Sequence, residues 1–447
     1  MAYKIGMVSL GCPKNQVDAE IMLASLVADG FELTNDDQKA DAIIVNTCGF
    51  IEDAKREAID NILEVAELKK TGKLKALIVS GCLAQRYKDD MRRDIPEIDA
   101  IVTLGQNGEI ARIVRDAINA KENKPLMFEA ELGCLPINGD RLLTTPSYTA
   151  YLKIAEGCDN CCTYCAIPMI RGRFRSREID DIVNEAHGLA QSGVKELTVV
   201  AQDTTRYGED IYGKQSLPEL LDKLCEIDGI EWIRVLYTYP ERINDELLDC
   251  IAKQSKICKY LDIPIQHAAD GVLKRMNRKS TNAELRELIT KIRSRIPNMV
   301  IRTTMIVGFP GETDEDFTEL CEFVQWARFD RLGCFTYSPE DGTIAAEMPD
   351  QIEPDIKERR YEVLMAEQSV ISEEIAAKKL EKSIKVLVEG YDSLNKCCYG
   401  RSESDAPDID GKVFFTAAKK PKEGEFVTVK VTDTIEYDLI GELERVD

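Results

Sequence analysis

Residues 156–165 read Glu-Gly-Cys-Asp-Asn-Cys-Cys-Thr-Tyr-Cys and place four cysteines within eight positions. Such a density of thiols is hard to explain by core packing and indicates a metal-binding loop. Three ligands can be chosen in two ways: Cys158, Cys161 and Cys165 give CxxCxxxC, whereas Cys158, Cys162 and Cys165 give CxxxCxxC. Cys161 and Cys162 are not expected to bind one cluster together, because neighbouring side chains diverge. A four-cysteine zinc site built from this loop alone is disfavoured for the same reason, whereas three thiolates on a 4Fe-4S cluster leave one iron open.

The cysteine loop follows the first of six apolar segments that alternate with helical patterns. The expected strands are residues 151–155, 195–201, 232–237, 260–265, 299–307 and 332–337. The expected helices between them include residues 178–191, 216–226, 244–254, 282–295 and 313–327. Six such βα units predict a partial or complete parallel barrel, with its chemistry at the C-terminal ends of the strands.

A second group of cysteines lies in the first ~120 residues, where strands and helices also alternate. Cys12, Cys48 and Cys82 each come immediately after an expected strand. The strands are residues 5–10, 42–45 and 76–79, and the helices are residues 17–29, 51–70 and 84–92. This pattern predicts a small open α/β sheet, in which parallel strands end at the same edge and the three thiols face one crevice. Helix N-termini beside them favour thiolates, so a second three-cysteine cluster with an open iron is expected.

The C-terminal residues change character after a long charged helix at about residues 354–380. Four β-rich segments separated by Gly and Asp/Pro turns predict a small antiparallel, OB-like barrel; they are residues 385–388, 412–416, 425–431 and 439–444. The expected organisation is an N-terminal domain, a linker, a barrel core and a C-terminal domain, with bounds 1–120, 121–147, 148–376 and 378–447. The fold class is α/β with a small β-barrel at the end.

The charge of the chain bears on its partner. With 80 acidic and 58 basic residues the net charge is -22, which argues against the basic footprint of a nucleic-acid binder and suits a basic partner. Asp405, Asp408 and Asp410 lie on one loop, for which we expect docking to such a partner, with a solvated face as the alternative.

Fifteen cysteines, an odd number, and only two histidines fit a reducing compartment and nearly exclude mixed Cys/His zinc sites. No apolar run approaches the roughly 20 residues of a membrane span, and no signal peptide is recognisable. A soluble, cytoplasmic protein with no membrane contact is expected.

The cysteine motifs together resemble a known family. Gly-Cys-Pro-Lys-Asn (residues 11–15), Asn-Thr-Cys-Gly-Phe-Ile (46–51) and Ser-Gly-Cys-Leu-Ala-Gln-Arg (80–86), followed by the loop at 156–165, are similar to the radical S-adenosylmethionine (SAM) methylthiotransferases. The resemblance covers essentially the whole chain, and the C-terminal barrel resembles a TRAM domain. Within the loop, the CxxxCxxC spacing with Tyr164 before the last cysteine resembles the radical SAM superfamily. The resemblance therefore implies Cys158, Cys162 and Cys165 as ligands, with Cys161 a spectator.

The resemblance also implies a reaction. Family members carry two 4Fe-4S clusters and insert a methylthio group at an unactivated C–H bond. One SAM molecule donates its methyl group to a sulfur at the N-terminal cluster, held by Cys12, Cys48 and Cys82. A second, at the barrel cluster, yields the 5′-deoxyadenosyl radical that abstracts hydrogen. A radical is needed because no acid–base pair removes hydrogen from a saturated carbon at neutral pH.

The substrate implied by the resemblance is a protein. Cys-Pro-Lys-Asn (12–15), Gly-Phe-Ile (49–51) and residues 400–411 are similar to the branch that modifies the β-carbon of an aspartate in small-subunit ribosomal protein uS12. An electron donor such as a flavodoxin or ferredoxin and a sulfur donor are implied as further partners. The sister branch, which methylthiolates an adenosine beside the anticodon of transfer RNA, shares both cluster motifs and is the alternative. A third alternative is a non-catalytic iron–sulfur or zinc-binding scaffold.

The expected contacts of SAM lie at the barrel strand ends. We expect polar side chains that follow a strand to bind the cofactor there, and glycines to admit the edge of its adenine. The candidate residues are Tyr164, Gln202, Asp203, Thr204, Arg302, Ile306 and Gly308.

Overall fold

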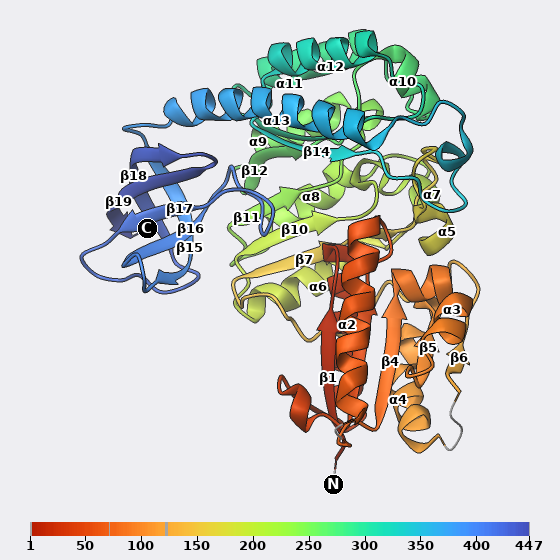
Figure 1. Ribbon diagram of the computed structural model, residues 1–447. Helices are drawn as coiled ribbons and strands as arrows, with labels where there is room; N and C mark the ends of the chain where they lie inside the picture. The colour runs from red at the N-terminus through yellow and green to blue at the C-terminus, as the bar shows by residue number, and fades with distance from the viewer. Residues whose placement is uncertain (1, 71, 121–123, 447) are drawn as a thin grey trace.

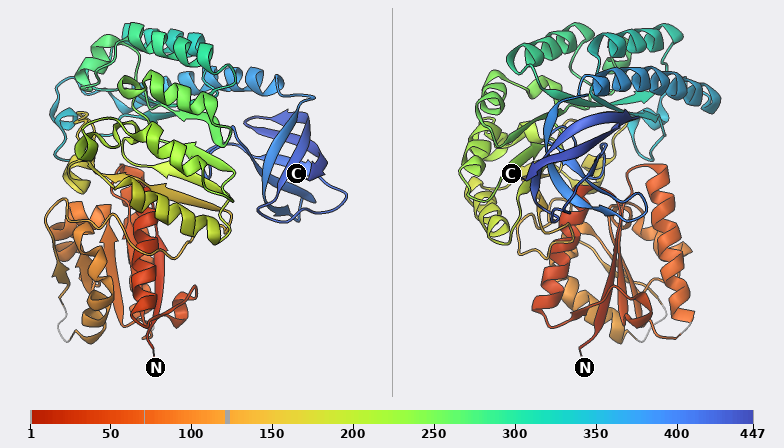
Figure 2. Two further views of the ribbon diagram at one scale, coloured as in Figure 1. Left: turned by 180° about the vertical axis from the view of Figure 1, so that it is seen from behind. Right: turned by 90° about the vertical axis from the view of Figure 1, so that its left-hand side faces the viewer.

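Three bodies of different architecture make up the protein, whose computed structural model describes residues 2–70, 72–120 and 124–446 (Figure 1). The first is an open parallel sheet, the second a curved six-stranded sheet, and the third a small closed barrel. Figure 2 shows the curved sheet in the middle, with the open sheet below it and the closed barrel against its concave side. Among the described residues, no helix combines the length and the apolar character needed to span a bilayer.

The N-terminal sheet has the strand order β2-β1-β3-β4-β5-β6, with neighbouring strands parallel. Its strands are β1 (Lys4–Ser9), β2 (Glu32–Leu33), β3 (Ala42–Thr47), β4 (Ala76–Gly81), β5 (Ala100–Val102) and β6 (Leu126–Phe128). The central strands β3 and β4 are buried at every position, as their continuous apolar runs predict for strands covered on both faces. Strand β6 lies within the expected linker 121–147, so part of that segment completes the sheet; residues 121–123 of the linker lie outside the described residues.

Two pairs of helices cover this sheet. Helices α1 (Pro13–Ala28) and α4 (Ile110–Asn119) pack on one face, where Met22 and Ile113 share a core with Ile44. Helices α2 (Glu52–Lys70) and α3 (Cys82–Asp94) pack on the other face. Pro13 opens α1, because proline at the first helical position gives up an N–H that has no partner there.

The middle body is the partial barrel that the sequence predicts. Its parallel strands run in the order β14-β13-β12-β11-β10-β7. They are β7 (Thr149–Lys153), β10 (Glu196–Val200), β11 (Trp232–Val235), β12 (Ile257–Asp262), β13 (Val300–Val307) and β14 (Arg331–Thr336). A short hairpin of β8 (Ala155–Glu156) and β9 (Arg175–Ser176) follows β7.

Helices cover the convex side of the partial barrel (Figure 1). They are α6 (Ile179–Gln191), α8 (Leu217–Cys225), α9 (Asp245–Lys253), α11 (Asn282–Arg295) and α12 (Asp314–Ala327), with α13 (Pro354–Ala377) packed on β14. Shorter helices lie in the loops: α5 (Ile167–Arg171), α7 (Glu209–Tyr212) and α10 (Asp270–Arg275). Helices α11 and α12 begin where Thr281 and Thr313 form capping boxes, which satisfy N–H groups of the first turn.

The C-terminal body is a closed five-stranded barrel in the order β15-β16-β17-β19-β18. The strands are β15 (Ser383–Asp392), β16 (Cys397–Ser402), β17 (Val413–Thr416), β18 (Phe426–Ile435) and β19 (Asp438–Val446). Four of them correspond to the expected β-rich segments, and β16 is the strand that the sequence pattern missed. Alternate residues of these strands, among them Val386, Val427 and Val429, fill the barrel interior.

This closed barrel is fixed to the concave side of the partial barrel by buried charges. The carboxylate of Glu196, at the start of β10, accepts hydrogen bonds from Arg401 (2.6 Å) and Arg234 (3.1 Å). Trp232 and Phe426 meet edge-to-face with ring centroids 4.8 Å apart. Because Glu196 and Trp232 open their strands, the contact lies toward the N-terminal end of the barrel, opposite the end where chemistry is expected.

The Asp-rich loop takes part in this internal contact, and its expected docking to a basic partner is wrong for Asp405 and Asp410. Asp405 accepts a hydrogen bond from Arg331 (2.6 Å) and is 2% exposed. Asp410 accepts one from the hydroxyl of Tyr260 (2.6 Å), and even the exposed Asp408 accepts one from Tyr151 (3.0 Å). The loop is acidic because it faces arginines and tyrosines of the chain's own barrel.

Candidate active site at two cysteine triads

The N-terminal cysteines lie at one edge of the open sheet. Cys12 precedes α1, Cys48 follows β3, and Cys82 is the first residue of α3 after β4. Strands β1, β3 and β4 are neighbours in the sheet. The chain crosses over between β1 and β3, and open α/β sheets bind ligands in the crevice at such a switch point. The expected convergence of the three turns is therefore what the topology produces.

Glycines show how closely these turns approach one another. A side chain at Gly11 would place its Cβ 2.7 Å from Cβ of Cys48, and one at Gly49 would lie 2.8 Å from Cα of Leu83. The first turn thus packs on the second, and the second packs on the third. Gly81, with φ of +94°, leaves no room for a Cβ, which would lie 2.3 Å from the carbonyl oxygen of Thr47.

The thiols of this triad share an electrostatic environment. Burial is the main cause that raises the pKa of Cys82 to about 12. The nearby guanidinium of Arg171 lowers this pKa, whereas the thiols of Cys12 and Cys48 raise it. Burial also raises the pKa of Cys48. An N–H of Arg171 points at the sulfur of Cys82, with Nη2 and Sγ 3.4 Å apart. Metal binding would displace the thiol protons, because thiolates are the ligating species.

The barrel cysteines lie in one loop between β8 and α5. The N–H of Cys165 donates to the carbonyl of Cys162 (3.1 Å), so the end of the loop is a tight turn. Cys158, Cys162 and Cys165 are partly buried, whereas Cys161 is exposed and has a left-handed backbone with φ of +51°. Cys161 is thus the one cysteine of this loop that is exposed, and the CxxxCxxC set of ligands remains a prediction.

The surroundings of the barrel triad are aromatic and cationic. Burial is the main cause that raises the pKa of Cys158 to about 12, and the neighbouring Cys162 contributes to this rise. The hydroxyl of Tyr239 lies 3.2 Å from Sγ of Cys162. The guanidinium of Arg278 stacks on the Tyr239 ring, 3.9 Å from its centroid. An arginine so placed offsets negative charge on the thiolates.

The donor sets fit iron–sulfur clusters. The N-terminal triad offers three thiols from turns that meet, and the barrel triad offers three from one loop. Neither has a histidine or a carboxylate among its members, which is the ligand chemistry of Fe–S centres. Within residues 2–70, 72–120 and 124–446, no three Cys, His, Asp or Glu side chains are grouped as ligands of a single metal ion. A cubane is larger than one ion and holds its thiolates farther apart.

Of the expected SAM contacts, Gln202, Asp203 and Thr204 follow β10 at the C-terminal edge of the barrel. Asp203 is fully buried and accepts a hydrogen bond from the Asn160 amide (2.9 Å) of the cysteine loop. The hydroxyl of Thr204 donates to the carbonyl of Leu236 (2.9 Å). These two side chains position the loop and its neighbouring strand, while Gln202 retains a buried oxygen that accepts no hydrogen bond.

The remaining expected contacts lie along β13 and beside the cysteine loop. Arg302 pairs with Asp262 (2.7 Å), and Asp410 of the Asp-rich loop lies 3.8 Å away. A Cβ at Gly308, where φ is +71°, would lie 2.3 Å from Cγ of Lys357, so packing of α13 accounts for this glycine. Ile306 and Tyr164 share an apolar cluster at the strand ends. The ring of Tyr164 meets Phe309 edge-to-face, with centroids 6.5 Å apart.

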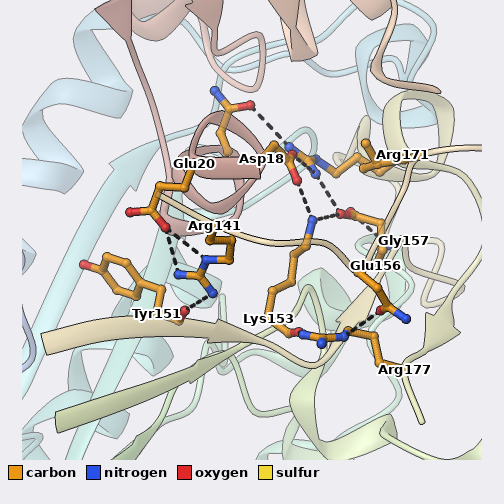
Figure 3. Close-up of polar contacts among 12 residues, drawn as sticks. Asp18, Glu20, Arg141, Tyr151, Lys153, Glu156, Gly157, Arg171 and Arg177 are labelled. Atoms are coloured by element: carbon orange, nitrogen blue, oxygen red, sulfur yellow. Dashed lines mark hydrogen bonds and ion pairs between the residues drawn. The ribbon is translucent and has the colours of Figure 1, made fainter. Parts of the chain in front are cut away.

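A buried ionic network joins the two cysteine sites (Figure 3). Asp18 of α1 accepts a hydrogen bond from Arg171 (2.9 Å) and pairs with Lys153. Glu156, two residues before Cys158, accepts one from Arg171 (2.9 Å) and another from Lys153 (3.0 Å). All four side chains are at most 1% exposed. Burial opposes the ionisation of Glu156, yet Arg171 and Lys153 hold the pKa of this carboxyl below its usual range.

Arg171 is the member of this network that touches both sites. One of its nitrogens reaches Glu156 beside the barrel triad, and the other reaches the sulfur of Cys82. A second ionic contact supports the same arrangement from the far side of the sheet. Arg86 of α3 and Lys55 of α2 both reach Glu340 after β14, at 2.6 Å and 3.2 Å. The open sheet is therefore held with its cysteine edge facing the C-terminal edge of the barrel.

The residues of this network are not among those that the sequence predicts for the site. Asn15, which lies 3.5 Å from Arg171, and Arg86 belong to the cysteine motifs, and Glu156 opens the loop at residues 156–165. Their presence there was the available signal. The sequence gives no signal of which residues pair, because the partners of Asp18 are 135 and 153 residues away.

Comparison with family models divides the chain in the same three parts. Residues 4–103 match the uncharacterized protein family UPF0004, residues 152–324 match the radical SAM superfamily, and residues 382–443 match the TRAM domain.

Relatives similar over nearly their whole length carry one name. The proteins named ribosomal protein uS12 methylthiotransferase RimO from Desulforamulus reducens and Lachnoclostridium phytofermentans are 51% and 52% identical to this chain. They cover 99% of it in both cases, and the match spans 99% and 100% of their own lengths. The protein of that name from Clostridioides difficile is 50% identical, with 98% of each chain covered.

A solved structure shows the same fold at low identity. The radical S-adenosylmethionine methyltransferase TsrM from Kitasatospora setae superposes with a TM-score of 0.53 and 12% identity, covering 74% of this chain and 73% of its own. The identities to the relatives above, over whole chains, decide the family. The chain belongs to the radical SAM methylthiotransferases, in the family that includes the ribosomal protein uS12 methylthiotransferases.

Proposed function

We propose that the protein transfers a methylthio group to the β-carbon of an aspartate in ribosomal protein uS12, with SAM and two 4Fe-4S clusters as cofactors. The observation that supports this proposal is the pair of three-thiol sites on opposite sides of one domain interface, joined through Arg171. A single cluster would serve radical formation alone, whereas insertion of sulfur also needs a site that presents sulfur.

The two triads have separate roles in this proposal. Cys158, Cys162 and Cys165 hold one cluster and leave one iron for SAM, and Cys12, Cys48 and Cys82 hold the other. When bound, the clusters supply the electron that cleaves SAM and the sulfur that is transferred. The side chains around them have structural tasks: Asp203 holds the barrel loop through Asn160, and Arg171 fixes the spacing of the two sites.

SAM is placed at the C-terminal edge of the barrel in this proposal. Tyr164, Gln202 and Ile306 lie there with atoms free to contact it, and the buried oxygen of Gln202 that accepts no hydrogen bond supports this role. Asp203, Thr204 and Gly308 contribute by shaping that edge. Arg302 does not lie at the end of its strand as expected, because it is the third residue of β13, where it pairs with Asp262 and lies beside Asp410 of the closed barrel. The bounds 1–120, 121–147, 148–376 and 378–447 are proposed as the units that carry sulfur presentation, linkage, radical formation and the TRAM fold.

The protein substrate is supported by charge and by the names of the relatives. The net charge of -22 suits a basic ribosomal protein better than a polyanion. The proposed setting is the cytoplasm, where uS12 is made, with a flavodoxin or ferredoxin as the electron donor and a separate sulfur donor.

Mass spectrometry of uS12 tests the proposal. The protein is isolated from cells with and without this enzyme, and the mass increment of a methylthio group is sought on one aspartate. We expect the increment only in cells that contain the enzyme. If the increment persists in its absence while transfer RNA loses a methylthio group on adenosine, the substrate is the nucleic acid and the proposal is wrong.

A further inference from the structure

Lys14 differs from the other buried cations of the domain interface. Its residue is 8% exposed, yet within the described part of the chain no carboxylate oxygen lies within the 4.0 Å of an ion pair from its ammonium. The nearby Lys153 has two carboxylate partners, Asp18 and Glu156. The ammonium of Lys14 instead lies over the ring of Tyr237, 3.2 Å from its centroid. The groups beside this ammonium that favour its charge are the hydroxyl of Tyr237 and the thiol of Cys12. Since no carboxylate is among them, the ammonium can take an acidic ligand as a further partner.

The position of Lys14 relates it to both cysteine sites. It lies in the first turn of α1, two residues after Cys12. Tyr237, on which it rests, belongs to the other body and follows β11 at the C-terminal edge of the barrel. The ammonium therefore lies at the interface between the body that carries Cys12 and the C-terminal edge of the barrel.

Tyr237 is held in an uncommon conformation for this contact. Its φ of +59° lies in the left-handed region, which non-glycine residues adopt at a cost. The backbone is fixed there from both sides: the N–H of Tyr237 donates to Asp262 (3.0 Å), and its carbonyl accepts from the N–H of Thr204 (3.0 Å). Strained backbone of this kind is found at ligand-binding sites. The aromatic face gives the ammonium a partner that a stronger one can replace.

We propose that Lys14 binds the side-chain carboxylate of the substrate aspartate and so makes the enzyme selective for an acidic side chain. This inference rests on the proposed function and adds to it the group that recognises the substrate. The carboxylate is one bond from the β-carbon that is modified, so an ammonium beside the reaction space can hold it while that carbon is attacked. The flexible stem of lysine lets a point charge follow the carboxylate.

The test compares two substrates that differ only in charge. The anaerobically reconstituted enzyme is given purified uS12, or uS12 in which the modified aspartate is replaced by asparagine. Asparagine keeps the β-carbon and its C–H bonds, so the chemistry is preserved. Lys14→Met removes the charge and keeps an apolar chain over Tyr237, Lys14→Arg restores a cation, and Lys39→Met removes an exposed lysine of the same body as a control.

We expect the wild-type enzyme to prefer the aspartate substrate, and Lys14→Met to lose that preference. Its kcat/KM for aspartate should fall about 30-fold or more, which is the size expected when one partner of a buried charge pair is removed. Lys14→Arg should recover part of the preference, and Lys39→Met should match the wild type. Iron content and 5′-deoxyadenosine formation should be unchanged in all of them.

Other outcomes overturn the inference. If Lys14→Met retains the preference, or if it loses activity equally on both substrates together with iron, the lysine has a structural role or neutralises the cluster. A wild-type enzyme that modifies neither form of uS12 would contradict the proposed function itself, which is a different result.

Discussion

The two cysteine sites reach the same ligand number by opposite routes. The barrel site takes three cysteines from eight consecutive positions, so one loop determines its geometry. The N-terminal site takes single cysteines from three turns, 36 and 34 residues apart, so the whole open sheet determines its geometry. The first site therefore depends on local turns, whereas the second depends on how closely three loops pack. Mutations should therefore affect the two sites independently, except where Arg171 joins them.

The largest expected effect comes from the barrel loop. Cys162→Ala removes one of three proposed ligands and should lower 5′-deoxyadenosine formation by at least about 1,000-fold, a loss of the size seen when an essential group is deleted. Cys161→Ala, in the adjacent position, should leave the rate unchanged, because that residue is exposed whereas the three proposed ligands are partly buried. Single-turnover assays with reductant measure both. An equal loss in the two variants would mean that the loop uses another set of ligands.

The packing of the N-terminal turns gives the second test. Gly81→Ala places a methyl group 2.3 Å from a carbonyl oxygen and requires a left-handed backbone of alanine. A displacement of about 1 Å at a reacting centre costs roughly 100-fold, so methylthiolation should fall by about that factor. Formation of 5′-deoxyadenosine should stay within about twofold of wild type. Gly188→Ala, in α6 with open space around it, is the matched control. Loss of both activities in Gly81→Ala would show that the sites are not independent.

Arg171 contacts both cysteine sites, so a change of this residue should affect the two sites together. Arg171→Met leaves Asp18 and Glu156 with only Lys153 as a cation, and removing one partner from a buried ionic group costs about 3–5 kcal/mol. Denaturant unfolding should show this loss, and iron should leave both sites more easily. Arg93→Met, which removes an exposed arginine of α3, should leave the free energy of unfolding unchanged. If Arg171→Met has the stability of the wild type, the network does not hold the two bodies together.

A smaller effect, dependent on pH, should come from the opposite end of the barrel. Burial alone would raise the pKa of Glu196. Arg401 and Arg234 lower this pKa by more than burial raises it, so it lies below the usual 4.5. Its contribution to stability is thus complete above pH 4.5 and is lost as the pH falls through the lower folded-state pKa. The gap in unfolding free energy between wild type and Glu196→Gln should shrink over that range. A gap that stays constant with pH would exclude an ionised Glu196.

Much of the molecule could be predicted from residues close in sequence. The turns that carry Cys12, Cys48 and Cys82 follow apolar runs, and parallel topology alone brings them together. Strand β16 was missed because it begins at Cys397 after a tight turn and contains Gly400, which breaks the β-rich pattern. The sequence predicts a linker where strand β6 lies, because this strand is three residues long and only its pairing with β5 identifies it.

What could not be predicted depends on partners that are far apart in sequence. Asp405 was expected to face another protein, but it pairs with Arg331, 74 residues away. Acidic composition does not reveal which cation a carboxylate meets. For the same reason Arg171 gave no signal as a link between the sites, and Lys14 became informative only once the positions of all neighbouring carboxylates were known.

The content of iron and sulfide in anaerobically reconstituted protein measures how many clusters the two cysteine sites hold. Three chains are compared: the wild type, one with Cys12, Cys48 and Cys82 changed to alanine, and one with Cys158, Cys162 and Cys165 changed to alanine. Two independent 4Fe-4S sites predict about eight irons in the wild type and about four in each variant. About four irons in the wild type, or loss of all iron when either triad is removed, would contradict the account.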